Sequence, residues 1–112
     1  GSACITTAGL LNARYVIHAV GPVWRGGDSG ERELLAGAYR RTLDLARDQG
    51  LASLSFPSIS TGAYRFPLTE AAPIALAMVK AHLEGETSIE RVAFVLFNEE
   101  TFEAYEKALA SI

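Results

Sequence analysis

The sequence has too little cysteine, too little basic charge and too short apolar runs for several classes of protein. Its single cysteine, Cys4, excludes an internal disulfide and a cysteine-rich metal cluster, so a reducing compartment is expected. The net charge of −3 argues against non-specific nucleic-acid binding, which needs clustered Lys and Arg. No apolar run approaches the ~20 residues that span a bilayer, and no signal peptide is recognisable. These absences predict a cytoplasmic protein without membrane or non-specific nucleic-acid partners.

The length allows one domain, since 112 residues are too few for two. The two histidines have no cysteine or carboxylate at ligand spacing, so we predict no metal site and no cofactor. We expect His18, which has apolar neighbours in a short strand, to be a structural residue with a hydrogen-bonded ring. His82 falls on a helix face, where a catalytic role is not expected.

Short β-branched runs alternate with segments of helical periodicity. Strands are predicted at residues 3–7, 15–20, 54–57 and 92–97, and helices at residues 31–49, at 68–84 and after Asn98. This alternation indicates an α/β layered sheet. The last run is apolar throughout, which is typical of a strand buried on both faces of a parallel sheet. We therefore expect strands 15–20, 54–57 and 92–97 in one sheet, with helices on both faces.

Local signals add three expectations about the segments between and within these elements. Residues 24–30 hold three glycines and predict a mobile surface loop. Asp28 and Glu31 have the spacing of a capping box at the start of the first long helix. In the last helix, three residues at helical spacing predict an inner stripe: Phe102, Tyr105 and Leu109.

The segment 57–67 carries the strongest functional signal, because it leads from a predicted parallel strand into a helix. Ligands bind in α/β sheets at such strand ends. Ser58, Ser60 and Thr61 supply hydroxyls, and a positive φ at Gly62 would let successive N–H groups face one phosphate or diphosphate. Tyr64 could cover the ligand. The alternative is a turn in which these residues only satisfy local geometry, and spacing alone leaves both interpretations open.

Three stretches of the sequence resemble the macrodomain family, whose members bind ADP-ribose. They are residues 15–22 (Tyr-Val-Ile-His-Ala-Val-Gly-Pro), the 57–67 loop with its Ile-Ser-Thr-Gly core, and residues 92–97 leading into Asn98. They stand in the family's order, and residues 1–9 also resemble its preceding strand and turn. The resemblance implies a three-layer α/β/α fold with a mixed, mostly parallel sheet. It also implies that residues 1–112 form a single macrodomain that is incomplete at its N-terminal side.

The resemblance also implies where ADP-ribose binds. The residues that match the loop around the diphosphate and distal ribose are Ser60, Thr61, Gly62, Ala63 and Tyr64. Phe97 and Asn98 match positions beside the adenosine half, where an aromatic ring can stack on the base at ~1–3 kcal/mol. The alternative for Phe97 is the last core residue of a buried strand. No catalytic residue is assigned.

The family's N-terminal segment has no counterpart in this sequence. It would supply a strand between those at 15–20 and 54–57, an acidic residue for the adenine, and a second Gly-rich loop. Without that strand, buried backbone groups would be left unpaired. We therefore expect that residues 1–112 alone do not give a folded monomer that binds ADP-ribose. The segment could act as a second chain, or strand exchange with a second copy could replace it.

Three functional hypotheses follow from the resemblance. The first is an ADP-ribose-binding macrodomain that hydrolyses ADP-ribose derivatives, by deacylating O-acyl-ADP-ribose or removing mono-ADP-ribose from proteins. The second is a non-catalytic reader of ADP-ribose. The third is an incomplete fragment without independent activity. The predicted partners are ADP-ribose or a derivative, and an ADP-ribosylated protein.

Overall fold

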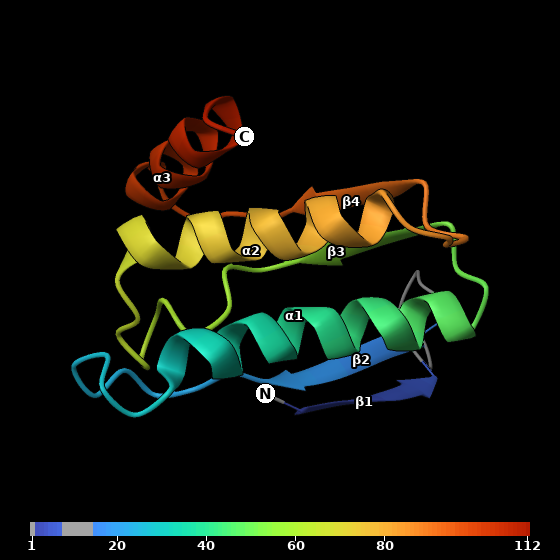
Figure 1. Cartoon of the computed structure of the whole chain (residues 1–112), viewed down its shortest axis with the longest axis horizontal. Coiled ribbons are helices and arrows are strands. Elements are labelled where there is room, and N and C mark those ends of the chain that lie inside the picture. Colours follow the sequence, from blue (N-terminus) through green and yellow to red (C-terminus); the bar gives the residue numbers. More distant parts are fainter. Residues whose placement is uncertain (1, 8–14) are drawn as a thin grey trace.

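Four strands and three helices make up the described part of the chain. A computed structural model of the protein describes residues 2–7 and 15–112. The elements, in chain order, are β1 (Ser2–Thr7), β2 (Tyr15–Val20), α1 (Glu31–Asp48), β3 (Ser53–Phe56), α2 (Leu68–Leu83), β4 (Arg91–Phe94) and α3 (Glu99–Ala110). Each element lies where the sequence predicts it, to within one to three residues at its ends. In Figure 1, α1 and α2 run side by side on one side of the strands, and α3 lies beyond α2.

The described strands form two separate pairs. β1 and β2 are antiparallel, with Ser2 opposite Val20, and β3 and β4 are parallel, with Phe56 opposite Phe94. No pairing joins β2 to β3 in the described residues, so the prediction of one continuous sheet is wrong for them. Instead, α1 packs on β1 and β2 and also on α2, which connects the two pairs through side chains. The interruption lies where the family resemblance implies a further strand.

The β3–β4 pair has one covered face and one open face among the described residues. The side chains toward the helices are Leu54, Phe56, Val92 and Phe94, and Ser55 and Ala93 between them are exposed. The prediction that residues 92–97 are buried on both faces is therefore wrong. Pairing ends earlier as well, since β4 spans only Arg91–Phe94. An apolar run indicates that both faces of a strand are suited to burial. Burial on both faces also requires other elements that cover each face of the sheet.

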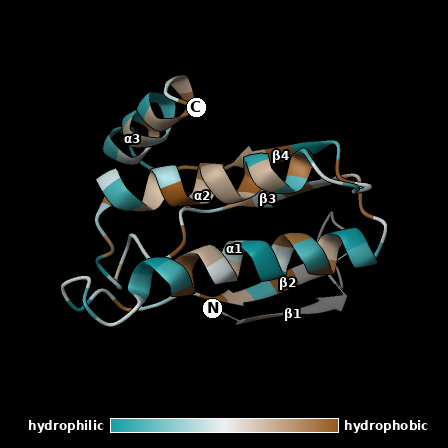
Figure 2. Ribbon diagram, in the orientation of Figure 1, coloured by the Kyte–Doolittle hydropathy of each residue, from teal (hydrophilic) through white to brown (hydrophobic). Residues whose placement is uncertain are grey.

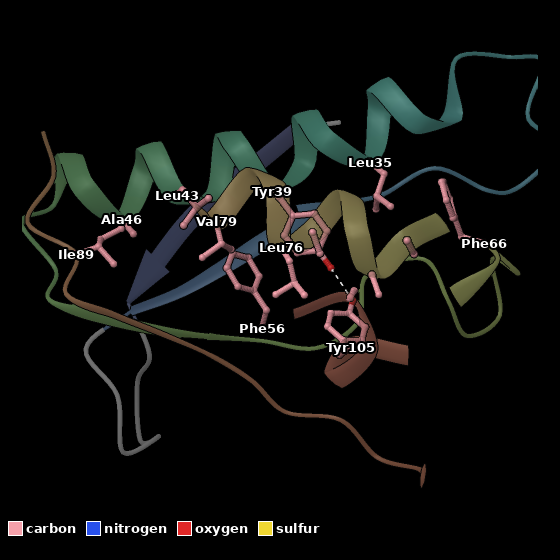
Figure 3. Close-up of a cluster of buried hydrophobic side chains, with 14 residues drawn as sticks. Leu35, Tyr39, Leu43, Ala46, Phe56, Phe66, Leu76, Val79, Ile89 and Tyr105 are labelled. Atoms are coloured by element: carbon pink, nitrogen blue, oxygen red, sulfur yellow. Dashed lines mark hydrogen bonds between the residues drawn. The ribbon is translucent and has the colours of Figure 1, made fainter. Parts of the chain in front are cut away.

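The core lies between the helices and β3–β4. Leu35, Tyr39 and Leu43 of α1 are fully buried, and each such leucine contributes ~1.5–3 kcal/mol by leaving water. Ala72 and Ala75 of α2 are also fully buried, and α2 packs on α1. Figure 2 shows both helices banded in polar and apolar colours, and Figure 3 shows the buried side chains of this cluster. No helix of the described residues is long and apolar enough to cross a membrane.

Helix α3 packs on a slightly different face from the one its periodicity predicts. Tyr105 is buried as expected, but its buried neighbours are Thr101 and Ala108. Phe102 and Leu109 are 54% and 59% exposed, so the predicted stripe is correct only at Tyr105. These two exposed residues line an apolar groove of about 670 Å³ between α2, α3 and β4. Helical spacing places three residues on one face but does not say which part of that face is covered.

Candidate functional site

The predicted site residues come from the carboxyl ends of two neighbouring parallel strands. The 57–67 loop follows β3, and Phe97 and Asn98 follow β4. The Val95 N–H donates to the Phe56 carbonyl at 2.8 Å, which keeps the two strands together just beyond the last paired residues. Parallel strands end at the same edge of a sheet, so both segments lie at one edge (Figure 1). This is the edge at which open α/β sheets bind ligands.

A run of unpaired backbone N–H groups occupies the middle of the 57–67 loop. The N–H of Ile59 donates to the Tyr39 hydroxyl at 3.1 Å, and that of Phe66 donates to the Ser60 carbonyl at 2.9 Å. Between them, none of the five N–H groups of residues 60–64 has an acceptor among the residues that the structure describes. Successive free N–H groups in a turn form a concave site for an anion.

The loop takes its left-handed conformations at residues other than the predicted glycine. The expectation of a positive φ at Gly62 is wrong, and the positive values fall at Ser60 (φ 66°) and Arg65 (φ 60°). The Ser60 carbonyl accepts a hydrogen bond from the Phe66 N–H, and this bond closes the loop from Ser60 to Phe66. A left-handed residue other than glycine costs ~1–2 kcal/mol. Such strained residues persist where the surroundings enforce them, often at ligand sites.

Gly21, at the end of β2, allows the loop to approach more closely than any side chain would permit. A Cβ at Gly21 would lie 2.2 Å from the Ser60 Oγ and 2.5 Å from the Ile59 Cγ2. The sequence marks Gly21 only as the end of a strand, and nothing local signals this contact. The Ser60 Oγ is buried, and among the described residues it is the only buried side-chain nitrogen or oxygen atom that has no hydrogen-bond partner. A ligand oxygen could satisfy this hydroxyl, which otherwise carries a desolvation cost of ~1–3 kcal/mol.

Trp24 ties the loop to the two long helices. The backbone N–H of Trp24 donates to the Tyr64 carbonyl at 2.8 Å, and the centre of its ring lies 4.8 Å from that of Phe66. The Arg32 guanidinium of α1 lies 5.4 Å from the centre of the Trp24 ring and forms an ion pair with Glu70 of α2. Tyr64 is thereby held through its backbone, while its side chain remains 45% exposed.

The 24–30 loop is fastened at its base by a buried carboxylate. Glu31 accepts hydrogen bonds from the backbone N–H groups of Arg25, Gly27 and Ser29 at 2.6–2.9 Å. The predicted capping box is wrong, because the N-cap of α1 is Gly30 and no side chain caps the helix there. Glu31 is the first helical residue, so its carboxylate reaches back along the loop.

The Glu31 carboxylate makes the stability of the protein depend on acidic pH. The N–H of Arg25 is the largest cause that lowers the Glu31 pKa from 4.5 to about 2, and it outweighs the burial that raises it. A carboxyl group with a depressed folded-state pKa stabilises the protein above pH ~4.5, and this contribution is lost as the pH falls toward ~2. Glu31→Gln should therefore lower the melting temperature at pH 7 and reduce its decline between pH 4.5 and 2. Calorimetric melts should show no such change for Glu33→Gln, an exposed carboxyl in the same turn; equal behaviour of the two variants would contradict the assignment.

Phe97 and Asn98 present different groups at the other half of the site. The Phe97 side chain is 87% exposed, so its interpretation as a core residue is excluded and its ring is open to a ligand. The Asn98 Oδ1 accepts the Thr101 N–H at 2.8 Å and caps α3, as the sequence predicts. The ligand contacts of Phe97, Asn98 and residues 60–64 stay predictions.

The remaining histidine candidate has structural contacts. The His82 Nε2 lies 2.8 Å from the Thr87 hydroxyl, and its Nδ1 lies 3.8 Å from an Asp44 oxygen. Nowhere in residues 2–7 and 15–112 do three His, Cys, Asp or Glu side chains gather as metal ligands would.

Comparisons with protein-family models and with known sequences both return the macro domain. The family model described as "Macro domain" matches residues 1–75. A macro domain-containing protein of Cupriavidus necator is 54% identical over 98% of this chain and 64% of its own length. A Klebsiella pneumoniae protein named O-acetyl-ADP-ribose deacetylase is 51% identical over 99% of this chain and 63% of its own. The chain thus spans about three fifths of the length of these relatives.

Solved structures agree with these sequence relatives. The Oceanobacillus iheyensis macrodomain with ADP is similar over 98% of this chain and 57% of its own, with a TM-score of 0.90 and 40% identity. The Trypanosoma brucei macrodomain in complex with ADP-ribose is similar over 96% of this chain and 44% of its own, with a TM-score of 0.86 and 37% identity. The predicted α/β fold class is confirmed by this similarity.

Proposed function

The chain belongs to the macrodomain family, and on that premise we propose that the protein binds ADP-ribose at the edge formed by the ends of β3 and β4. The unpaired N–H groups of residues 60–64 are the observation that carries the proposal. They offer a diphosphate the hydrogen bonds that the protein itself does not use. The buried, unpartnered Ser60 hydroxyl supports the same interpretation.

The positions of the 57–67 loop and of residues 97–98 indicate where the other parts of ADP-ribose bind. With the diphosphate on residues 60–64, the adenosine extends toward Phe97 and Asn98, where the exposed ring can stack on the base. The distal ribose lies on the Tyr64 side of the loop. Solved relatives named as macrodomains contain ADP or ADP-ribose, which supports this class of ligand.

We further propose that the bound ligand is a substrate whose distal ribose carries an acyl group or a protein side chain. For the acyl group, a water attacks the carbonyl carbon and the bond from that carbon to the ribose oxygen breaks. The ribose oxygen takes up a proton from the water, so the products are a carboxylic acid and a ribose hydroxyl. The loop contributes by placement: it fixes the diphosphate so that a phosphate oxygen can orient the water beside the scissile bond. The name O-acetyl-ADP-ribose deacetylase of relatives about 51% identical supports this reaction.

The proposal is tested on the full-length protein with two measurements. Calorimetric titration with ADP-ribose measures binding, and release of acetate from O-acetyl-ADP-ribose measures hydrolysis. Turnover of a mono-ADP-ribosylated protein is assayed in parallel. Binding together with turnover supports the hydrolase, and binding without turnover supports a reader. Absence of binding contradicts both.

Gly62→Val should weaken ADP-ribose binding by at least tenfold, or ~1.4 kcal/mol. A Cβ at Gly62 would meet no atom within 4 Å in the described part of the chain, and the residue has no positive φ, so the folded protein should tolerate the change. The loss arises because the branched side chain stands where a phosphate oxygen would approach the N–H groups. The test is calorimetric titration of the variant with ADP-ribose, with its melting temperature as the control for folding. If the variant and the wild type bind ADP-ribose equally well, the loop does not contact the ligand.

A further inference from the structure

Four hydroxyl groups connect the candidate diphosphate loop to the aromatic core. Tyr39 comes from α1, Tyr105 from α3, and Ser58 and Thr61 from the loop itself. The Tyr39 and Tyr105 oxygens lie 3.4 Å apart, and a dashed line marks this hydrogen bond in Figure 3. The Tyr105 oxygen lies 2.8 Å from the Ser58 Oγ, and the Thr61 hydroxyl lies 2.8 Å from the same Oγ.

One backbone hydrogen bond of this network has a fixed direction. The Ile59 N–H donates to the Tyr39 oxygen. In the Tyr39–Tyr105 pair and in the Tyr105–Ser58 pair, either hydroxyl can be the donor. Burial raises the pKa of Tyr39 far above its ordinary value, so the Tyr39 hydroxyl keeps its proton at any physiological pH.

The rings that carry these hydroxyls are held independently of them. Tyr39 is fully buried and meets Phe56 edge-on at 5.1 Å, and Tyr105 lies 5.0 Å from Phe94. Because Phe56 and Phe94 belong to β3 and β4, the two tyrosines lie against the strands whose ends form the site. Removing either hydroxyl would leave the ring packing in place and delete its hydrogen bonds to the loop and to the other tyrosine.

We propose that Tyr39 and Tyr105 are positioning residues, which rests on the proposed binding of a diphosphate by residues 60–64. They draw the start of the loop inward at Ser58 and Ile59. The Ile59 N–H is thereby committed to the core, and the free N–H groups begin at Ser60, where the backbone turns left-handed. The hydroxyls thus determine which amides the loop offers to an anion. Neither tyrosine needs to touch the ligand.

The test compares ligands with and without a diphosphate on the full-length protein. Tyr39→Phe and Tyr105→Phe should each raise the dissociation constants of ADP and ADP-ribose about tenfold and leave that of adenosine within about twofold. Tyr15→Phe, which removes a tyrosine hydroxyl in β2, is the control and should change none of them. Hydrogen exchange should become faster at the Ile59 amide in Tyr39→Phe. If Tyr39→Phe fails to fold, Tyr105→Phe and Ser58→Ala carry the same test.

The outcomes separate this inference from the proposed function. Wild-type protein that binds neither ADP nor ADP-ribose would overturn both. Wild-type protein that binds them, with the tyrosine variants binding equally well, would overturn only the positioning role. A variant that weakens adenosine and ADP by the same factor would also overturn it, because a purely structural defect acts on both ligands alike.

Discussion

Gly21→Ala should weaken ADP-ribose binding by at least tenfold, or ~1.4 kcal/mol. The new Cβ would stand 2.2 Å from the Ser60 Oγ and 2.5 Å from the Ile59 Cγ2, and both distances are far inside contact. The loop must move away from β2, which misplaces Ser60 and the free N–H groups that follow it. Such overpacking also costs ~1–3 kcal/mol of folding stability.

Gly85→Ala provides the matched control for this substitution. Among the described residues, a Cβ at Gly85 would meet only the His82 carbonyl, at an ordinary contact distance of 3.6 Å, and Gly85 lies beyond the opposite end of α2 from the loop. The two variants are compared by calorimetric titration at a temperature where both are fully folded. Gly21→Ala protein with wild-type affinity would show that the contact between β2 and the loop has no part in binding.

The second large effect is expected at Phe97. Phe97→Ala should weaken binding of adenosine-containing ligands by ~1–3 kcal/mol, or roughly 5- to 150-fold, if the ring stacks on the adenine. The melting temperature should stay unchanged, because the side chain is 87% exposed and removes little apolar surface from water. Affinity and stability are therefore separated by the same variant.

Leu109→Ala tests whether the effect belongs to Phe97 or to any exposed apolar side chain. Leu109 is 59% exposed and lies at the opposite end of α3 from Asn98. The Leu109→Ala variant should bind ADP and ADP-ribose as tightly as the wild type does. An unchanged affinity in Phe97→Ala would place the adenine elsewhere and leave the ring without a role in the site.

Local patterns predicted the elements and several of their ends, because these depend on nearby residues. The alternation of β-branched and helical segments located all four strands and three helices, and Asn98 caps α3 as its position indicated. The helix start at Glu31 was also correct, although the carboxylate accepts loop amides instead of completing a capping box. Periodicity and capping are properties of a few consecutive residues, and they can be read without the tertiary structure.

The errors arose where distant residues decide the outcome. The left-handed residues of the loop are Ser60 and Arg65 and not Gly62, because contacts with Gly21 and Tyr39 shape a turn that glycine spacing alone cannot locate. β3 pairs with β4 but not with β2. This choice depends on which strands lie side by side in the fold, and the sequence of a single strand does not determine that. For the candidate site, the sequence resemblance points to the loop and Phe97, whose ligand contacts stay predictions, and it gives no indication of the hydroxyl network beneath the loop.

The hydrogen bonds beneath the loop join residues that are far apart along the chain. Tyr39 and Tyr105 are separated by 66 positions, and Ser58 and Tyr105 by 47. Loop closure over such separations occurs late and at an entropic cost, so no short peptide from the loop should reproduce its shape. Occupancy of the site and cooperative folding are then linked equilibria. A ligand at a hundred times its dissociation constant would add ~2.7 kcal/mol to the stability of the entire domain, and not only to the loop that holds it.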